Sequence, residues 1–315
     1  MNLQSLYYFS ELAKTLHMTQ TAERLFISQQ NLSNHIQRLE NYYGVKLFER
    51  KPRLQLTYAG EQVLEFANMI NRESINLTNI LSEIKNEATG TIRFGGSPLR
   101  INAILPYVLS EFTQQFPHVE IRISDVLSKE LENKVLNYEV DFAVVTGHEP
   151  HPELIDVPLM EDPLYLCVSK KLLEKHLPDT YEMIIKKSAN GTDLKDFADI
   201  PFCILENRLG KMIDQVFKDV SVMPKVYSTS ILTQISTAIG LKGDAACFVP
   251  HLGLANIIDR LPPDMYIFPV LYKGKVLVQT VNLICRANQY HPAFEKLFME
   301  LLKKRYQEIA ELKMK

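Results

Sequence analysis

The feature that most constrains the fold is the pattern between residues 19 and 57 of this 315-residue chain. A first short segment places Ala22 and Leu25 on one face of a helix, with Thr19 as its expected N-cap. A second segment follows Ser28, its expected N-cap, and has apolar side chains at three- and four-residue steps: Leu32, Ile36, Leu39 and Tyr43. A basic segment of hairpin length comes next. This order predicts a winged helix-turn-helix.

The remaining face of the second helix consists almost entirely of amide and hydroxyl side chains. Its members are Gln29, Gln30, Asn31, Ser33, Asn34, Gln37 and Arg38. Gln and Asn pair with adenine edges in the major groove, and Arg pairs with guanine. Because the start of a recognition helix reaches base edges, we expect the DNA-binding site to begin at Ser28. The expected base contacts are Gln29, Gln30, Asn31, Ser33 and Asn34.

The charge of this segment differs from that of the rest of the chain. Residues 1–57 contain seven Lys or Arg and four Glu, whereas the other 258 residues contain 28 basic and 33 acidic side chains. The formal net charge of -2 therefore hides a basic N-terminal region. Lys46 belongs to a basic cluster at the expected wing, where phosphate contacts fix register without reading sequence. The expected phosphate contacts are Arg38, Arg50, Lys51 and Arg53. The alternative is a solvated basic loop, because short runs of Lys and Arg are common.

A spaced set of positions runs through the first sixty residues: Leu6, Phe9, Ala13, Ala22, Leu25, Ser28-Gln29, Ser33, Ile36, Leu39-Glu40, Gly44, Leu47-Phe48, Arg50, Arg53, Leu56-Thr57 and Gly60. This pattern resembles the N-terminal domain of LysR-type transcriptional regulators. The sequence departs from the family pattern at Thr21, at Leu16-His17 and at Gln30-Asn31. The resemblance implies a regulator of transcription whose partners are a double-stranded DNA operator, a small-molecule effector and RNA polymerase.

A long helical pattern runs from about residue 59 to residue 86. Its apolar seam, with one polar member, alternates steps of four and three residues through Val63, Ala67, Ile70, Ser74, Leu77, Leu81 and Ile84. Such a helix would be about 42 Å long, more than a small domain needs. Heptads are the geometry of paired helices, so we expect the apolar members to join two chains. The alternative is packing on the same chain. The resemblance agrees with a dimerising linker helix and implies a homodimer or a dimer of dimers.

From Thr91 onward, short apolar strand candidates alternate with helix-length segments, which predicts βαβ units and mainly parallel sheets. The candidates are TIRF, VEIRI, FAVV, LYLCV, FCIL, KVY, ACFV and VQTVNLIC. The segment from Thr91 to the last residue contains 225 residues, which exceeds one typical domain, so we expect two α/β lobes. The expected fold is α/β with an N-terminal all-α winged helix-turn-helix (1–58), a linker helix (59–88) and a two-lobed, periplasmic-binding-protein-like effector domain (89–315). The first lobe would comprise about 91–162 and 271–315, and the second about 163–270.

Two serines suggest where an effector binds. Ser97 follows the first strand and precedes a helix opening at Pro98, and Ser128 follows the second strand as the expected cap of another helix. Both would place hydroxyls beside helix N-terminal amides, so we expect a small carboxylate or similarly polar ligand. Each serine alone is more often only a cap, and Arg100 either adds a counter-charge or faces solvent. The resemblance adds Thr146, Leu205, Ser228 and Phe248 to the expected cleft.

Other chemistries find little support in the sequence. No signal peptide and no apolar run of eighteen residues is visible, so we expect a cytoplasmic protein without a membrane partner. There is no G-x-G-x-x-G, Walker, G-x-S-x-G or H-E-x-x-H motif, so we expect no enzyme, catalytic residue or cofactor. A solute-binding protein without transcriptional control is the alternative.

Histidine and cysteine could offer metal or redox chemistry. His148, Glu149 and His151 fit a surface loop better than a metal site, since further ligands are missing nearby. The four cysteines each lie in an apolar strand candidate, which favours reduced, buried thiols over a redox-sensing pair. They are Cys167, Cys203, Cys247 and Cys285.

Overall fold

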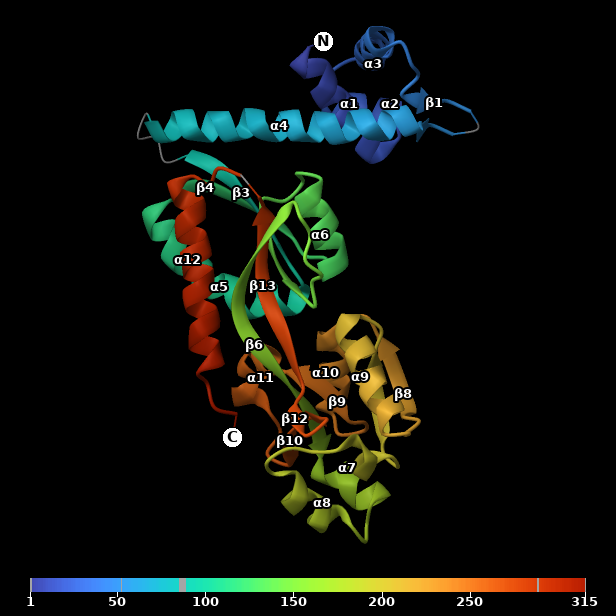
Figure 1. Ribbon diagram of the computed structural model, residues 1–315, viewed down its shortest axis with the longest axis vertical. Helices are drawn as coiled ribbons and strands as arrows, with labels where there is room; N and C mark the ends of the chain where they lie inside the picture. Colours follow the sequence, from blue (N-terminus) through green and yellow to red (C-terminus); the bar gives the residue numbers. More distant parts are fainter. Residues whose placement is uncertain (1, 52, 85–88, 288, 315) are drawn as a thin grey trace.

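The computed structural model describes residues 2–51, 53–84, 89–287 and 289–314, with the backbone alone for 82–84. Three parts follow one another along the long axis of the molecule: a small helical domain, one long helix lying across its base, and an α/β part beyond it (Figure 1). Within the described residues, no helix has the length and apolar character needed to cross a membrane.

The helical domain is a winged helix-turn-helix, as predicted. Its elements are α1 (Leu3–Thr15), α2 (Met18–Arg24), α3 (Gln29–Tyr43), β1 (Phe48–Glu49) and β2 (Gln55–Leu56), and the two strands pair antiparallel as the wing. Leu6, Phe9 and Leu12 of α1 pack against Leu32 and Ile36 of α3 in one core. That core fixes the angle at which α3 is presented.

Two of the residues that depart from the family pattern, His17 and Thr21, have local structural roles. The expected cap Thr19 is wrong, because α2 begins earlier and His17 caps it by accepting a hydrogen bond from the amide of Gln20 at 3.2 Å. Thr21 is fully buried, and its hydroxyl pairs with Thr15 and donates to the carbonyl of His17. A buried hydroxyl with these partners costs far less than an unpaired one.

The linker helix α4 (Tyr58–Ile84) has two different halves. In the first half, Val63, Ala67 and Ile70 pack on the core of the helical domain of the same chain, and Ala67 is fully buried. The intramolecular alternative therefore holds for this half, and Ala67 is removed from the expected dimer contacts. In the second half, Leu77 is 56% exposed and Leu81 is 50% exposed. The side chain of Ile84 and the expected helix end at 85–86 lie outside the described residues.

The first lobe is built on one edge of the large sheet. Its elements are β3 (Thr89–Gly96), α5 (Pro98–Gln115), β4 (His118–Ser124), α6 (Ser128–Leu136), β5 (Phe142–Thr146), β13 (Val278–Arg286) and α12 (Ala293–Ala310). Its core joins the strands to α5 and α12, which lie side by side on one face of the sheet (Figure 1).

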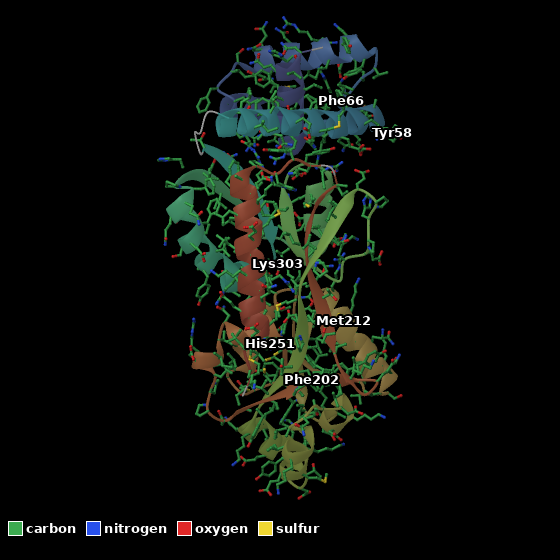
Figure 2. The ribbon with its side chains drawn as sticks, turned by 60° about the vertical axis from the view of Figure 1, so that its left-hand side comes forward. Tyr58, Phe66, Phe202, Met212, His251 and Lys303 are labelled. Carbon is green, nitrogen blue, oxygen red and sulfur yellow. The ribbon has the colours of Figure 1, made fainter. Side chains whose placement is uncertain are left out.

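The second lobe has its own core around Phe202, Phe217 and Phe248. Phe202 lies inside this lobe, at the far end of the molecule from α4 (Figure 2). The elements are α7 (Lys170–His176), α8 (Tyr181–Ser188), η1 (Leu194–Phe197), β7 (Pro201–Leu205), α9 (Arg208–Asp219), β8 (Lys225–Ser230), α10 (Thr233–Gly240), β9 (Cys247–Pro250), η2 (Ile258–Arg260), β10 (Met265–Pro269), β11 (Leu271–Tyr272) and β12 (Lys275–Val276). The short helix α11 (His251–Ala255) follows β9 but packs on α5 and α12 of the first lobe.

Two long strands connect the lobes, and they correct the expected topology. The sheet order is β10-β6-β13-β5-β3-β4, with β9 also on β6 (Leu154–Ser169). Among the strands, β3 pairs parallel with β4 and β5, and β7 pairs parallel with β8, with further isolated parallel bridges at Phe202–Ala246 and Thr192–Val270. The long strands β6 and β13 pair antiparallel with all their neighbours. The prediction of mainly parallel sheets was therefore wrong. Residues 271–277 were expected in the first lobe but belong to the second, because Tyr272 and Leu277 pack in the core of the second lobe.

Candidate DNA-binding face and effector cavity

The outer face of α3 presents the amides that the sequence singles out. Gln30, Asn31 and Asn34 are exposed, as is Arg38 further along, and Ser33 is half-buried. The opposite face of the helix lies in the domain core. Figure 1 shows α3 on the side of the domain away from the effector lobes. This placement leaves the expected base-reading side chains free to enter a groove.

Two of the expected contacts also have structural tasks. Ser28 caps α3 by accepting a hydrogen bond from the amide of Asn31 at 3.1 Å, as predicted. The side-chain oxygen of Gln29 accepts a hydrogen bond from the hydroxyl of Thr19 at 3.2 Å, which ties the start of α3 to α2. Thr19 therefore has a role in positioning α3 rather than in capping α2.

The buried carboxylate of Glu40, which belongs to the family pattern but had no role assigned from the sequence, docks the wing on α3. Glu40 accepts hydrogen bonds from the backbone amides of Leu47 and Phe48 and from Lys46, whose Nζ lies 2.7 Å away. Burial alone would raise the pKa of Glu40, but these hydrogen bonds hold it below its ordinary value. Lys46 is thus tied to the protein, while the cations at the tip are exposed: Arg50, Lys51 and Arg53.

A cavity of about 240 Å³ lies between the two lobes, where four helices begin. The starts of α5 and α6 line it from the first lobe, and the starts of α9 and α10 line it from the second. Helix N-termini carry unpaired amides and partial positive charge. The charged side chains of the lining are four cations, Arg100, Lys129, Arg208 and Lys211, and one carboxylate, Glu206.

On the first-lobe side, Ser97 and Arg100 act together. Ser97 begins α5 but makes no side-chain cap; its hydroxyl accepts a hydrogen bond from Nη1 of Arg100 at 2.9 Å. Arg100 is buried, and its Nη2 lies 3.9 Å from the buried carboxylate of Asp162. Burial raises the pKa of Asp162, and Arg100 opposes that shift. Arg100 therefore points inward beneath the cavity rather than out to solvent.

Ser128 has a different task from the expected one. It is the first residue of α6, and its hydroxyl accepts a hydrogen bond from the amide of Thr146 at 3.2 Å instead of capping the helix. The carbonyl of Thr146 accepts a hydrogen bond from Nη1 of Arg208 at 2.9 Å. Arg208 also pairs with both carboxylate oxygens of Glu132, at 2.5 and 2.9 Å. This ion pair joins α9 of the second lobe to α6 of the first.

Three of the expected cleft residues do not line the cavity. Leu205 and Phe248 are buried in the core of the second lobe, and Ser228 lies opposite Cys203 in the β7–β8 pair. These three residues lie within strands that helices cover, whereas most of the lining comes from residues just after strands and at the starts of helices. Asn207, for example, follows β7 and caps α9 by accepting from the amide of Gly210 at 3.0 Å. The strand-then-cap rule that selected Ser97 would also have found Asn207.

The histidines and cysteines form no metal site among the described residues. Residues 147–150 form a largely exposed loop, as predicted, although the side chain of His148 turns inward and lies 3.2 Å from Glu132 and 3.5 Å from Asp156. The cysteines are free thiols and buried, as predicted. Hydrogen bonding with Cys167, followed by burial, raises the pKa of Cys247, and burial raises that of Cys203. Raised pKa values disfavour the reactive thiolate.

Comparisons with known proteins agree with this architecture. Residues 3–61 match the bacterial regulatory helix-turn-helix protein, lysR family, and residues 85–307 match the LysR substrate binding domain. The chain is 32% identical over 313 residues to the uncharacterized HTH-type transcriptional regulator YkuM of Bacillus subtilis, covering 96% of this chain and 97% of that protein. It is 32% identical over 312 residues to a probable RuBisCO transcriptional regulator of Thalassiosira pseudonana, covering 95% and 96%.

Solved structures of full-length proteins share the fold. CbnR in complex with its target DNA aligns with a TM-score of 0.62 at 21% identity, over 97% of this chain and 100% of that one. OxyR from Pseudomonas aeruginosa aligns with a TM-score of 0.69 at 20% identity, over 99% of each chain. With both family domains matched in order along the chain, this protein belongs to the LysR family of DNA-binding transcriptional regulators.

Proposed function

We propose that this regulator is controlled by a small anionic metabolite, most simply a carboxylate, bound in the cavity between the lobes. The observation that carries the proposal is the convergence of four helix N-termini on that one cavity. Each contributes partial positive charge and free amides, and the effect is strongest for a ligand held within the first turn. A volume of about 240 Å³ suits a metabolite smaller than the usual drug-sized ligand.

The hydrogen-bond directions at the two serines favour an anion over a neutral donor. Ser97 accepts from Arg100 and Ser128 accepts from the amide of Thr146, so each hydroxyl keeps its own proton for a further partner. Each hydroxyl can therefore donate that proton to a ligand in the cavity, which suits a ligand with acceptors at both points. Carboxylate oxygens accept such hydrogen bonds without offering a competing proton.

For control, the ligand must bind one lobe arrangement better than another. The lobes meet through Arg208 and Glu132 at the rim of the same cavity, so a ligand there contacts both lobes at once. A difference of about 1–3 kcal/mol between two arrangements changes DNA affinity several-fold or more. We infer that the regulator binds its operator as a homodimer or a dimer of dimers, through the exposed amides of α3 and the cations of the wing.

Calorimetry on the full-length protein tests the effector class. Titration with a panel of small mono- and dicarboxylates should find at least one that binds, and Ser128→Ala should weaken that binding about tenfold, because a hydrogen bond to a charged ligand is lost. Ser110→Ala, an exposed serine on α5 away from the cavity, is the matched control and should bind as the wild type does. Equal affinity of the wild type and Ser128→Ala for the same carboxylate would place the site elsewhere.

A further inference from the structure

Arg72 is the only Lys or Arg in α4, and it is 3% exposed. Its Nη2 lies 2.5 Å from Asp141 and 3.5 Å from Glu295, two carboxylates of the first lobe that are themselves fully buried. A lone cation on an amphipathic helix normally faces water. Burying it against two carboxylates removes three charges from solvent, and such an arrangement is costly unless the partners stay in place.

A backbone amide and a histidine also contact the two carboxylates and hold them in position. Asp141 accepts a hydrogen bond from the backbone amide of Arg93 at 2.7 Å, and Glu295 pairs with His291 at 2.7 Å. The pKa of Asp141 is raised to about 6, and burial is the main cause. Arg72 and Arg93 lower this pKa, whereas Glu295 raises it further. Ionised Asp141 is thus maintained near neutral pH largely by Arg72.

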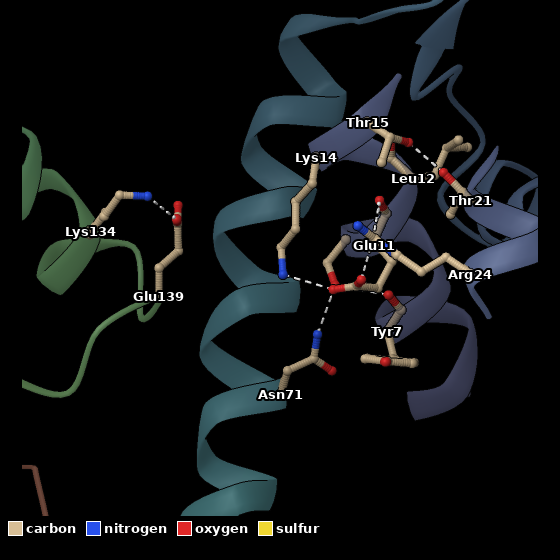
Figure 3. A network of polar contacts seen from close by, with 11 residues as sticks. Tyr7, Glu11, Leu12, Lys14, Thr15, Thr21, Arg24, Asn71, Lys134 and Glu139 are labelled. Atoms are coloured by element: carbon tan, nitrogen blue, oxygen red, sulfur yellow. Dashed lines mark hydrogen bonds and ion pairs between the residues drawn. The ribbon is translucent and has the colours of Figure 1, made fainter. Parts of the chain in front are cut away.

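On its other side, α4 is joined to the DNA-binding domain. The residue before Arg72, Asn71, donates a hydrogen bond to the hydroxyl of Ser10 in α1 at 3.0 Å. Figure 3 shows Asn71 pointing from α4 toward α1, near Glu11 with its ion pairs to Lys14 and Arg24. The first half of α4 also lies in the core of that domain. The helix and the DNA-binding domain therefore move as one body, and neighbouring residues 71 and 72 connect that body to two different domains.

Two strands run from the Arg72 cluster to the effector cavity. Asp141 directly precedes β5, whose five residues are all buried and whose last residue, Thr146, lines the cavity. Arg93 lies on β3, which pairs with β5 and ends one residue before Ser97, also in the lining. A five-residue strand spans about 17 Å. Close-packed strands transmit displacement rather than absorb it.

We propose that Arg72 is the positioning residue through which the state of the effector cavity sets the orientation of α4 and, with it, the DNA-binding domain. The proposal rests on the effector function proposed above. Ligand at the far ends of β3 and β5 shifts Asp141 relative to Arg72, and the buried ion pair has few arrangements that keep all three charges satisfied. The DNA-binding domain therefore changes orientation between discrete arrangements.

Distance measurements test the link without an effector. Spin labels are introduced at Tyr58→Cys on α4 and Lys303→Cys on α12, two exposed positions marked in Figure 2; the native thiols are buried and do not compete for label. Labelled protein is diluted with unlabelled protein so that only distances within one chain are measured. The parent should give one narrow distribution. Arg72→Met should broaden or shift it, and Arg72→Lys, which keeps the charge, should restore most of it.

The control is Lys225→Met, which removes an exposed cation paired with Asp199 on the second lobe, away from α4, and should leave the distribution unchanged. If Arg72→Met does not fold, Glu295→Gln replaces it, because this change keeps the shape of the side chain and removes one of the two carboxylate charges. An unchanged distribution in the folded variant overturns the proposal.

A second readout measures the coupling itself. With a carboxylate that binds the wild type, operator affinity is measured with and without that compound. Arg72→Met should bind the compound as the wild type does, yet the ratio of the two operator affinities should fall at least about fivefold, toward one. A retained ratio contradicts the proposal. If none of the carboxylates binds the wild type, the proposed effector class fails, and the distance measurements still decide the role of Arg72.

Discussion

At the scale of single residues, polar side chains of α3 divide into those held by the protein and those left for DNA. Ser28 and Gln29 hold the start of the helix, whereas Gln30 and Asn31 are exposed beside them. Glu40, three turns further along, is buried and docks the wing. The residue type alone does not tell which side chains hold the helix and which contact DNA, because a hydroxyl or amide can either cap a helix or form a hydrogen bond with a base.

The first prediction at this scale concerns Gln30. In the full-length protein, Gln30→Ala should cost about 1–3 kcal/mol on the operator, found by selection from random DNA, and little on random sequence. Lys51→Ala is the comparison: an exposed wing cation on phosphate should weaken both DNAs alike and reduce the salt dependence by about one unit of slope. Fluorescence anisotropy titrations at several salt concentrations measure both. Equal losses for Gln30→Ala on the two DNAs would move this residue to the phosphate-contacting class.

At the scale of elements, α4 carries a heptad seam whose two halves meet different partners. The first half is part of the DNA-binding core, so a charge at Ile70 would disturb that domain rather than report on dimerisation. The second half presents Leu77 and Leu81 to solvent within a single chain. Exposed leucines at heptad spacing are costly unless a second helix covers them.

We therefore predict that Leu77→Asp splits the dimer while each domain stays folded, because it places a charge in the seam against its symmetry mate. Operator affinity should fall with it, since two half-sites need two wings at fixed spacing. Thr78→Asp, an exposed neighbour with the same added charge, is the control and should stay dimeric. Sedimentation velocity at micromolar concentration measures this, and a Leu77→Asp protein that remains a dimer contradicts the seam.

At the scale of the whole molecule, the two lobes are held by the crossing strands β6 and β13 and by the ion pair of Arg208 with Glu132. The ion pair lies at the rim of the cavity, where Arg208 is part of the lining. It joins α9 of the second lobe to α6 of the first and so limits how far the two helices separate.

Removing the charge at Glu132 should loosen this contact. Glu132→Gln should speed hydrogen exchange at the starts of α6 and α9 by about five- to thirtyfold, which corresponds to the loss of about 1–2 kcal/mol from a hydrogen bond between charged groups. Glu130→Gln, on the exposed side of the same helix, should exchange as the wild type does. Unchanged exchange in Glu132→Gln would show that the crossing strands alone hold the lobes together.

The sequence by itself determined the local structure. Helical periodicity and the cap at Ser28 predicted α3, heptad spacing predicted α4, and short apolar runs predicted β3, β5 and β13. Each of these signals is carried by residues within one element, because the period of buried side chains reflects the geometry of that element alone. Ser97 and Ser128 were also found this way, since each stands at the start of a helix, whereas Thr146 came from the family resemblance.

Only the tertiary structure decided which elements meet. Arg72 and Glu295 are more than two hundred positions apart, and nothing in the periodicity of α4 or α12 pairs them. The family resemblance placed Leu205 and Phe248 in the cleft, but both lie in the core of the second lobe, because a strand's sequence does not say whether a helix or a ligand covers it. The cavity exists because sheet order brings four helix starts together, and sheet order is set by packing over the whole chain rather than by any one segment.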